Sequence, residues 1–150
     1  IGGNTSDGNV GSIDRITIST TGNAIKFGDL SEIRGSTPGA ASNPVTAIIY
    51  GGRSKNSTVI NTIDKMNMST QGSSRNFGEL SQLGNQVTGA TSSRTKVITN
   101  GGLLSGSVYT NTISIITISS SGGGEDFGDL TQPVGFHYST SDSHGGLGGF

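Results

Sequence analysis

Three acidic residues recur at a fixed spacing in a chain that otherwise offers few groups able to do chemistry. Asp29, Glu79 and Asp129 lie 50 residues apart, each inside a Phe-Gly-(Asp/Glu)-Leu tetrapeptide. If a closed fold brought these carboxylates together, they could ring a channel and bind cations. The same carboxylates are also typical of turns and strand ends, where they accept backbone N–H bonds. We favour the second interpretation, because recurrence in every repeat suits a folding role better than a unique site.

A metal site near the C-terminus is a second hypothesis. His137 and His144, with Asp142 between them, are residue types that bind zinc. A zinc site needs three or four ligands, and two histidines seven residues apart on loops are an unspecific pattern. We therefore expect hydrogen-bonded or solvated histidines, and we predict neither a metal site nor a cofactor.

Other short motifs do not add up to a catalytic site. Asp126, Phe127 and Gly128 spell the metal-binding triplet of kinases, but the first residue is Lys26 and Asn76 in the other repeats, and no catalytic-loop motif accompanies the triplet. Residues 122–126 and 4–8 resemble calcium loops, yet they lack the required period and the distal Glu. We expect both to be turns. No Gly-x-Ser-x-Gly motif occurs, so we predict no catalytic residues and no enzyme activity.

Aromatic side chains outside the repeated positions are the candidates for ligand contact. Phe136 and Tyr138 flank His137 in the most individual stretch of the chain, and we select these two as possible ligand contacts. Exposed aromatic rings can stack on sugars through their apolar faces. The alternative for Tyr50 and Tyr109 is ordinary packing, in a strand and in a loop respectively.

The elements that carry these residues belong to an internal repeat, which is a sign of a modular fold. The repeated tetrapeptide predicts a short strand that buries one Phe and one Leu. Burial of each Phe is expected to contribute roughly 1.5–3 kcal/mol. The residues at these positions are Phe27, Phe77, Phe127, Leu30, Leu80 and Leu130.

A second strand precedes the tetrapeptide in each repeat. Residues 13–19, 63–69 and 113–119 alternate apolar and polar residues, which predicts a half-buried strand. A glycine at position 22, 72 or 122 then marks a turn that reverses the chain.

Two further strands complete the predicted unit. Apolar residues 47–49 and 97–99 lead into glycine pairs, and small residues fill 39–42 and 89–92. A glycine pair after a strand permits positive φ or close backbone approach. These pairs are Gly51 with Gly52 and Gly101 with Gly102.

Four short strands per unit of 40–50 residues are typical of a propeller blade. We predict an all-β fold and a single repeat domain with units 1–50, 51–100 and 101–150. The phase of the pattern predicts half of one blade, two complete units and half of another. Known rings have four to eight blades, so closure would need a second copy or flanking repeats. The alternative is a β-trefoil or β-prism, which closes with three units in one chain.

Composition excludes several classes of function. Charged residues make up 13% of the chain, hydrophobic residues 29%, and glycine accounts for 26 of 150 residues. The net charge of −1, with scattered Lys and Arg, argues against nucleic-acid binding. The longest apolar runs are too short for a membrane span, and the absence of Cys excludes disulfides. Ile1 in place of Met is what we expect of a processed or cut N-terminus.

The order of these features resembles kelch repeats: an apolar strand, a glycine pair, a polar loop, an alternating strand, a turn and an aromatic strand. The usual kelch Trp is Phe27, Phe77 and Phe127 here, and the usual Tyr is Ile or Met. Residues 16–30 look more narrowly like repeats in virion-associated proteins of marine bacteriophages. That resemblance implies a fibre or appendage role in the virion and assigns no functional residues.

We therefore expect a non-enzymatic virion structural or adhesion module, such as part of a tail fibre, located at the virion surface or extracellularly. The resemblance implies host attachment, with host-surface glycans as possible ligands. Expected partners are further copies of the chain or flanking repeats, and other virion proteins. Two alternatives stay open: a carbohydrate-active propeller enzyme and a cellular kelch scaffold that binds a protein partner.

Overall fold

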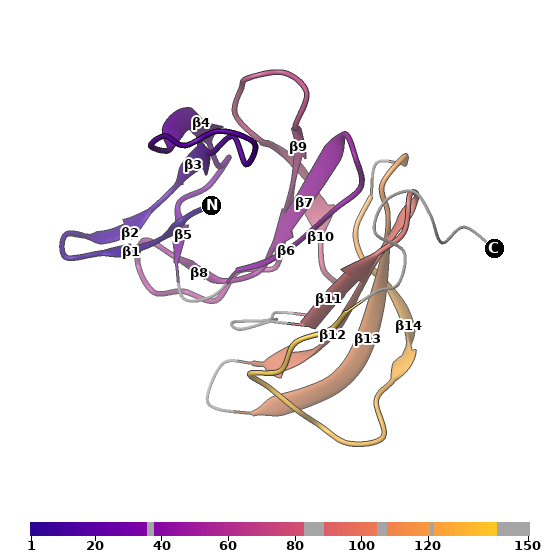
Figure 1. Ribbon diagram of the computed structural model, residues 1–150. Helices are drawn as coiled ribbons and strands as arrows, with labels where there is room; N and C mark the ends of the chain where they lie inside the picture. Colours follow the sequence, from indigo (N-terminus) through magenta and orange to yellow (C-terminus); the bar gives the residue numbers. More distant parts are fainter. Residues whose placement is uncertain (36–37, 83–88, 105–107, 121, 141–150) are drawn as a thin grey trace.

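The protein is an all-β array of antiparallel sheets that follow one another along the chain (Figure 1). The computed structural model describes residues 1–35, 38–82, 89–104, 108–120 and 122–140. Within these ranges every regular element is a strand, and none is a helix that could cross a membrane. The all-β prediction is confirmed.

The first complete sheet has four strands in the order of the chain. They are β6 (Gly39–Ser42), β7 (Thr46–Tyr50), β9 (Thr62–Asn67) and β10 (Arg75–Glu79). Each strand pairs antiparallel with the next. Asn43 stabilises the β6–β7 turn, where its Oδ1 accepts bonds from the backbone N–H groups of Val45 and Thr46 at 3.0 and 2.7 Å.

The second complete sheet repeats this arrangement 50 residues later. Its strands are β11 (Gly89–Ser92), β12 (Lys96–Leu103), β13 (Tyr109–Thr117) and β14 (Glu125–Asp129). Ser93 replaces Asn43 in the tight turn, and its Oγ accepts from the N–H groups of Thr95 and Lys96. The prediction of four strands per repeat is confirmed for these two sheets.

The N-terminal part supplies half a sheet. β3 (Ser12–Arg15) pairs with β4 (Ile25–Asp29), and these strands correspond to β9 and β10. A hairpin of β1 (Gly3–Thr5) and β2 (Gly8–Val10) precedes them, and β5 (Arg34–Gly35) pairs with β8 (Arg53–Ser54). The hairpin confirms the turn expected at residues 4–8.

The glycine pairs adopt the backbone that the sequence predicts. Gly51 and Gly52 have φ of 64° and 95°, and Gly101 and Gly102 have φ of 58° and 127°. L-residues with a Cβ rarely adopt such angles. At Gly52 a side chain would also approach the carbonyl oxygen of Gly35 to 3.0 Å.

Two apolar clusters lie between successive sheets and hold the array together. One joins the N-terminal half-sheet to the first complete sheet through Ile13, Phe27, Leu30, Ala47, Ile49 and Met66. The other joins the two complete sheets through Ile48, Tyr50, Ile63, Leu80, Val97, Ile116 and Ile118. The burial predicted for Phe27, Leu30 and Leu80 is confirmed, while Phe77 and Leu130 are only partly covered.

The two ends of the array depart from the predicted burial. β3 ends at Arg15, so the strand expected over residues 13–19 is shorter, and Ile16 and Ile18 are 63% and 95% exposed. Phe127 is 63% exposed, although the tetrapeptide predicted a buried side chain. The physical reason is that each sheet covers the Phe of the sheet before it, and no described sheet follows β14. The described strands therefore form an open array, with β3 and β14 far apart (Figure 1).

Candidate functional site

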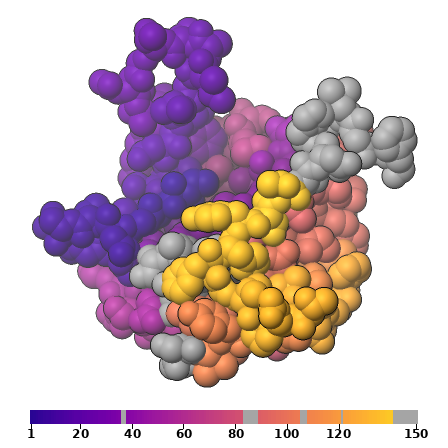
Figure 2. Space-filling model, turned by 60° about the horizontal axis from the view of Figure 1, so that its bottom comes forward, coloured from indigo at the N-terminus to yellow at the C-terminus, as the bar shows by residue number. Residues whose placement is uncertain are grey.

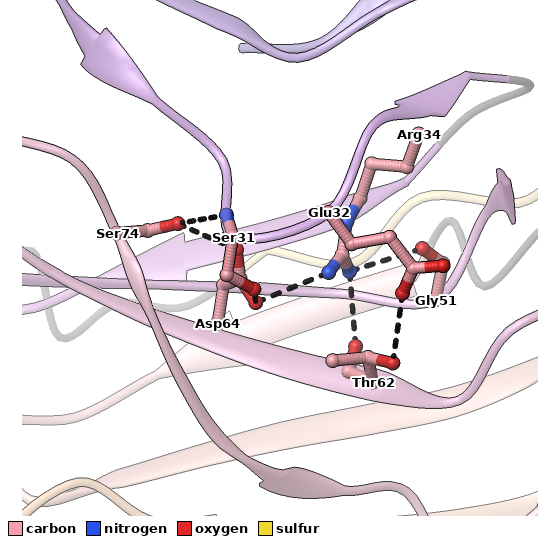
Figure 3. A network of polar contacts seen from close by, with 7 residues as sticks. All are labelled: Ser31, Glu32, Arg34, Gly51, Thr62, Asp64 and Ser74. Atoms are coloured by element: carbon pink, nitrogen blue, oxygen red, sulfur yellow. Dashed lines mark hydrogen bonds and ion pairs between the residues drawn. The ribbon is translucent and has the colours of Figure 1, made fainter. Parts of the chain in front are cut away.

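A fully buried ion pair lies where the N-terminal half-sheet meets the first complete sheet (Figure 3). Arg34 Nη2 is 3.1 Å from Asp64 Oδ1, and both side chains are 0% exposed. Arg34 comes from β5 and Asp64 from β9, so the pair links two segments 30 residues apart. A charge taken out of water is costly unless it is paired and hydrogen-bonded.

The surrounding groups supply those hydrogen bonds. Arg34 Nη1 donates to the carbonyl oxygens of Thr62 at 2.9 Å and Gly51 at 3.3 Å. Asp64 accepts from the backbone N–H of Ser31 at 2.9 Å and from the hydroxyls of Ser31 and Ser74. One buried donor, Arg34 Nε, has no partner. Burial lowers the pKa of Arg34, while the nearby Asp64 and Glu32 charges act in the opposite direction.

This network is a structural joint between sheets. No face of either charged side chain reaches solvent, so a substrate has no access to the pair. Sequence reasoning did not single out Arg34 or Asp64. The sequence did contain a signal for this pair. Asp64 is a charged residue at a strand position that holds Ser114 in the next repeat, and Arg34 is at a position that holds Val134 in the third repeat.

The recurring carboxylates do not form the hypothetical cation ring. Asp29, Glu79 and Asp129 are all exposed, and the described part of the chain contains no cluster of three or more metal-ligating side chains. Asp29 Oδ2 pairs with Lys26 Nζ at 3.0 Å, and Glu79 Oε2 accepts from the Asn61 side chain at 3.3 Å. The side-chain partners differ from the backbone N–H groups that we expected.

The kinase-like triplet lies within strand β14. Asp126 Oδ1 accepts a bond from the backbone N–H of Gly128 at 3.0 Å. His137 is also hydrogen-bonded, with Nε2 2.7 Å from Asn100 Oδ1. His144 and Asp142, the other members of the zinc hypothesis, lie outside the described residues.

An exposed aromatic surface is the feature best placed to meet a ligand. Phe136 and Tyr138 are 56% and 87% exposed, and Tyr109 is 47% exposed. The rings of Tyr109 and Phe136 meet edge to face, with centroids 6.4 Å apart. The last described residues, yellow in Figure 2, lie on the surface against the orange part of the third repeat. In contrast, Tyr50 is fully buried in the core, as the packing alternative predicted.

Backbone and side-chain contacts hold this surface in place. Val134 bridges the two long strands: its N–H donates to Thr110 O at 3.2 Å, and its carbonyl oxygen accepts from Gly102 N at 2.8 Å. Three residues further on, His137 binds the Asn100 side chain on β12. Phe136 adopts a φ of 56°, a conformation that a non-glycine residue takes only when its surroundings enforce it.

The hollows of the described residues are modest. A cavity of about 20 Å³ between the complete sheets is lined by residues that include Leu80, Thr99 and Ser114, and has room for about one water molecule. A larger hollow of about 340 Å³ is bordered by Lys65 and Arg75. The Lys65 amine is already engaged, because it donates to Ile118 O at 2.6 Å.

Comparison with known proteins finds a similar fold among solved structures and no relative by sequence. No protein-family model and no curated protein matches the chain. Among solved structures, the chain is similar to one titled "Structure of YjhT", with a TM-score of 0.70 and 11% sequence identity. The match covers 88% of this chain and 48% of the other, so this chain spans about half the length of the structure that it matches. At this identity the likeness concerns the fold alone.

Proposed function

We propose that the sheets are blades of a kelch-like β-propeller. Three observations support this. Each complete sheet is a four-stranded antiparallel meander in chain order, successive sheets pack face to face through equivalent residues, and the glycine pairs take positive φ at equivalent places. A β-trefoil or β-prism would not stack repeated four-stranded meanders in this way.

We propose further that the protein is a non-enzymatic structural and adhesion module of a virion surface, which binds host-surface glycans. The observation that carries the adhesion role is the exposed aromatic surface formed by Tyr109, Phe136 and Tyr138. Aromatic rings present apolar faces to the C–H groups of a sugar, while a Tyr hydroxyl bonds its polar edge. The virion assignment rests on the sequence resemblance of residues 16–30.

The non-enzymatic role is consistent with the contacts that three carboxylates make. On the surface, Asp29 forms an ion pair with Lys26, and Glu79 accepts a hydrogen bond from Asn61. Asp64 forms the buried ion pair with Arg34. Glycoside hydrolysis requires two carboxyl groups facing one bond across a site. These three side chains serve other partners.

Glycan binding is tested with the purified chain and a panel of bacterial surface polysaccharides. Binding is measured by calorimetry for the wild type, Tyr138→Ala and Phe136→Ala. Loss of a stacked aromatic contact is expected to weaken binding roughly tenfold. Val45→Ala is the matched control, because Val45 is 50% exposed at a turn of the first complete sheet.

Two results would contradict the proposal. The first is polysaccharide binding that is unchanged in both aromatic variants, or no binding to any member of the panel. The second is release of new reducing ends from a polysaccharide, which would favour the carbohydrate-active enzyme instead.

A further inference from the structure

The same backbone contact joins successive sheets twice. The N–H groups of Gly72 and Ser74 donate to the carbonyl oxygens of Phe27 and Asp29, at 3.1 and 2.9 Å. Fifty residues later, Gly122 and Gly124 donate to Phe77 and Glu79 at 3.3 and 2.8 Å. The carbonyl groups of the last strand of one sheet thus accept hydrogen bonds from a turn of the next sheet, at the same repeat positions in both places.

Apolar side chains reinforce this contact in both places. Phe27 belongs to the cluster that contains Met66 and is joined by Met68. Phe77 packs against the cluster that contains Ile116 and Ile118. Each Phe therefore shares an apolar cluster with the residues at two fixed repeat positions of the following sheet.

The two halves of a third contact of this kind are both exposed, at opposite ends of the array (Figure 1). Phe127 on β14 is the third equivalent of Phe27 and Phe77, and it is 63% exposed. Ile16 and Ile18 are the third equivalents of the residues that share a cluster with those rings, and they are 63% and 95% exposed. The violet segment of the N-terminal half-sheet projects from the bulk of the molecule in Figure 2.

The glycine of the tetrapeptide shows the same difference. A side chain at Gly28 would collide with the carbonyl oxygen of Gly72, and one at Gly78 with that of Gly122. At Gly128 the described residues, apart from its two chain neighbours, place no atom within 4 Å of where a Cβ would be. The space that a neighbouring turn fills in the first two contacts is open at the third.

We infer that β14 of one chain docks on the exposed β3 end of a second copy. In the docked pair, Gly22 and Ala24 of the second copy donate their N–H groups to Phe127 O and Asp129 O. The Phe127 ring packs against Ile16 and Ile18 of that copy.

The polar joint also has equivalents at the docked surface. Ser31 donates to the Asp64 carboxylate, and in the next contact the hydroxyls of Ser81 and Ser114 lie 3.0 Å apart. The third contact would place the hydroxyl of Thr131 beside Asp14 of the second copy. Asp14 is exposed in the single chain, so its carboxylate is available for this bond.

The number of copies is inferred from the form of the contact together with the length of the fold that this chain resembles. A head-to-tail interface produces a closed ring when its rotation closes and an open filament when it does not. The fold that this chain resembles is about twice as long, since the match covers 48% of that structure. Two copies, each docking on the other, would supply that amount of fold. The occupant of the surface is therefore a second copy of this chain.

The test is the native mass of the purified 150-residue chain, measured by sedimentation across a series of concentrations. The wild type is expected at twice the chain mass of 15.2 kDa. Phe127→Asp and Ile18→Lys should each reduce the native mass to that of one chain. Both side chains are exposed in the single chain, so circular dichroism spectra should stay unchanged. Val45→Asp, at an exposed site outside the contact, should keep the wild-type mass.

Mixing the Phe127→Asp and Ile18→Lys variants tests the head-to-tail pairing itself. In the mixed pair, one interface brings the introduced carboxylate against the introduced amine, and the other interface retains the original Phe127 against the original Ile18. The mass should therefore return to that of two chains. A wild-type chain that stays single at every concentration would overturn the inference, and flanking repeats of a longer chain would then be the candidate occupant. Growth into heavier species would exclude closure by two copies, and a mixture that stays single would exclude this pairing.

Discussion

At the residue scale, the chain concentrates its buried charge at a single described joint. Arg34 and Asp64 are both 0% exposed, while the other buried side chains of the described residues are uncharged. The pair draws its strength from several donors and acceptors, because the Coulomb attraction of a buried pair is largely offset by desolvation. Its consequence is a defined placement of β5 against β9 (Figure 3).

Removing one member of this pair is expected to be costly. Arg34→Met leaves the Asp64 carboxylate buried without its cation, which should lower the free energy of unfolding by about 3–5 kcal/mol. Urea unfolding, with Phe127→Asp as the common background to exclude association, measures the change. Lys26→Met is the control, because it breaks the exposed Lys26–Asp29 pair and should cost only about 0–1 kcal/mol. Equal losses in the two variants would refute a special role for the joint.

A buried phenol makes stability sensitive to alkaline pH. Burial raises the pKa of Tyr50 above its ordinary value. The unfolded chain therefore releases this proton near pH 10, while the folded chain still holds it. The contribution is complete below about pH 10 and falls by about 1.4 kcal/mol per pH unit above it. Tyr50→Phe should flatten the slope of unfolding free energy against pH in that range, and an unchanged slope would show that other groups cause it.

At the element scale, the strand carrying the tetrapeptide is a docking surface as well as a sheet edge. β4 and β10 each accept two backbone N–H bonds from the turn of the following sheet. The glycine after Phe keeps the strand bare at the point of approach. This explains why the Phe-Gly pair recurs in every repeat, whereas the residue before Phe varies between Lys26, Asn76 and Asp126.

Two glycines form a matched pair for testing the close approach. Gly78 and Gly128 have similar positive φ angles of 154° and 144°, so replacement by Ala introduces comparable backbone strain. Only Gly78 faces a neighbouring turn within the chain. Gly78→Ala should therefore destabilise the chain by about 1–3 kcal/mol more than Gly128→Ala. Urea unfolding in the Ile18→Lys background measures both without association, and similar values would show that the backbone alone requires glycine.

At the scale of the whole molecule, a repeated contact gives the array two unlike ends. The last strand of each sheet is covered by the next sheet along the chain. Phe127 at one end of the array and Ile18 at the other are therefore left exposed. The exposed surfaces at both ends of such an array are buried only when the array closes into a ring or continues with further sheets. The native mass of the chain and of its mixed variants, described above, is the measurement that belongs to this scale.

The local parts of the fold could be predicted from the amino-acid sequence. The 50-residue spacing, the alternating strands and the glycine pairs predicted the four-stranded units and the positive φ at Gly51 and Gly101. These features depend on backbone preferences and on residues close together in the chain. Local pattern is sufficient for them, because a strand or turn is chosen largely by its own side chains.

The burial of the repeated residues and the pairing of distant residues depend on how the sheets pack, so the sequence pattern could not predict them. Phe27 and Phe127 begin the same Phe-Gly-Asp-Leu tetrapeptide, yet one is 5% exposed and the other 63%. The difference comes from the neighbouring sheet, which no pattern within the tetrapeptide records. The pairing of Arg34 with Asp64 and of His137 with Asn100 likewise joins residues from separate repeats or strands. Burial and partner choice are properties of the packed array, because they depend on what lies across the space between sheets.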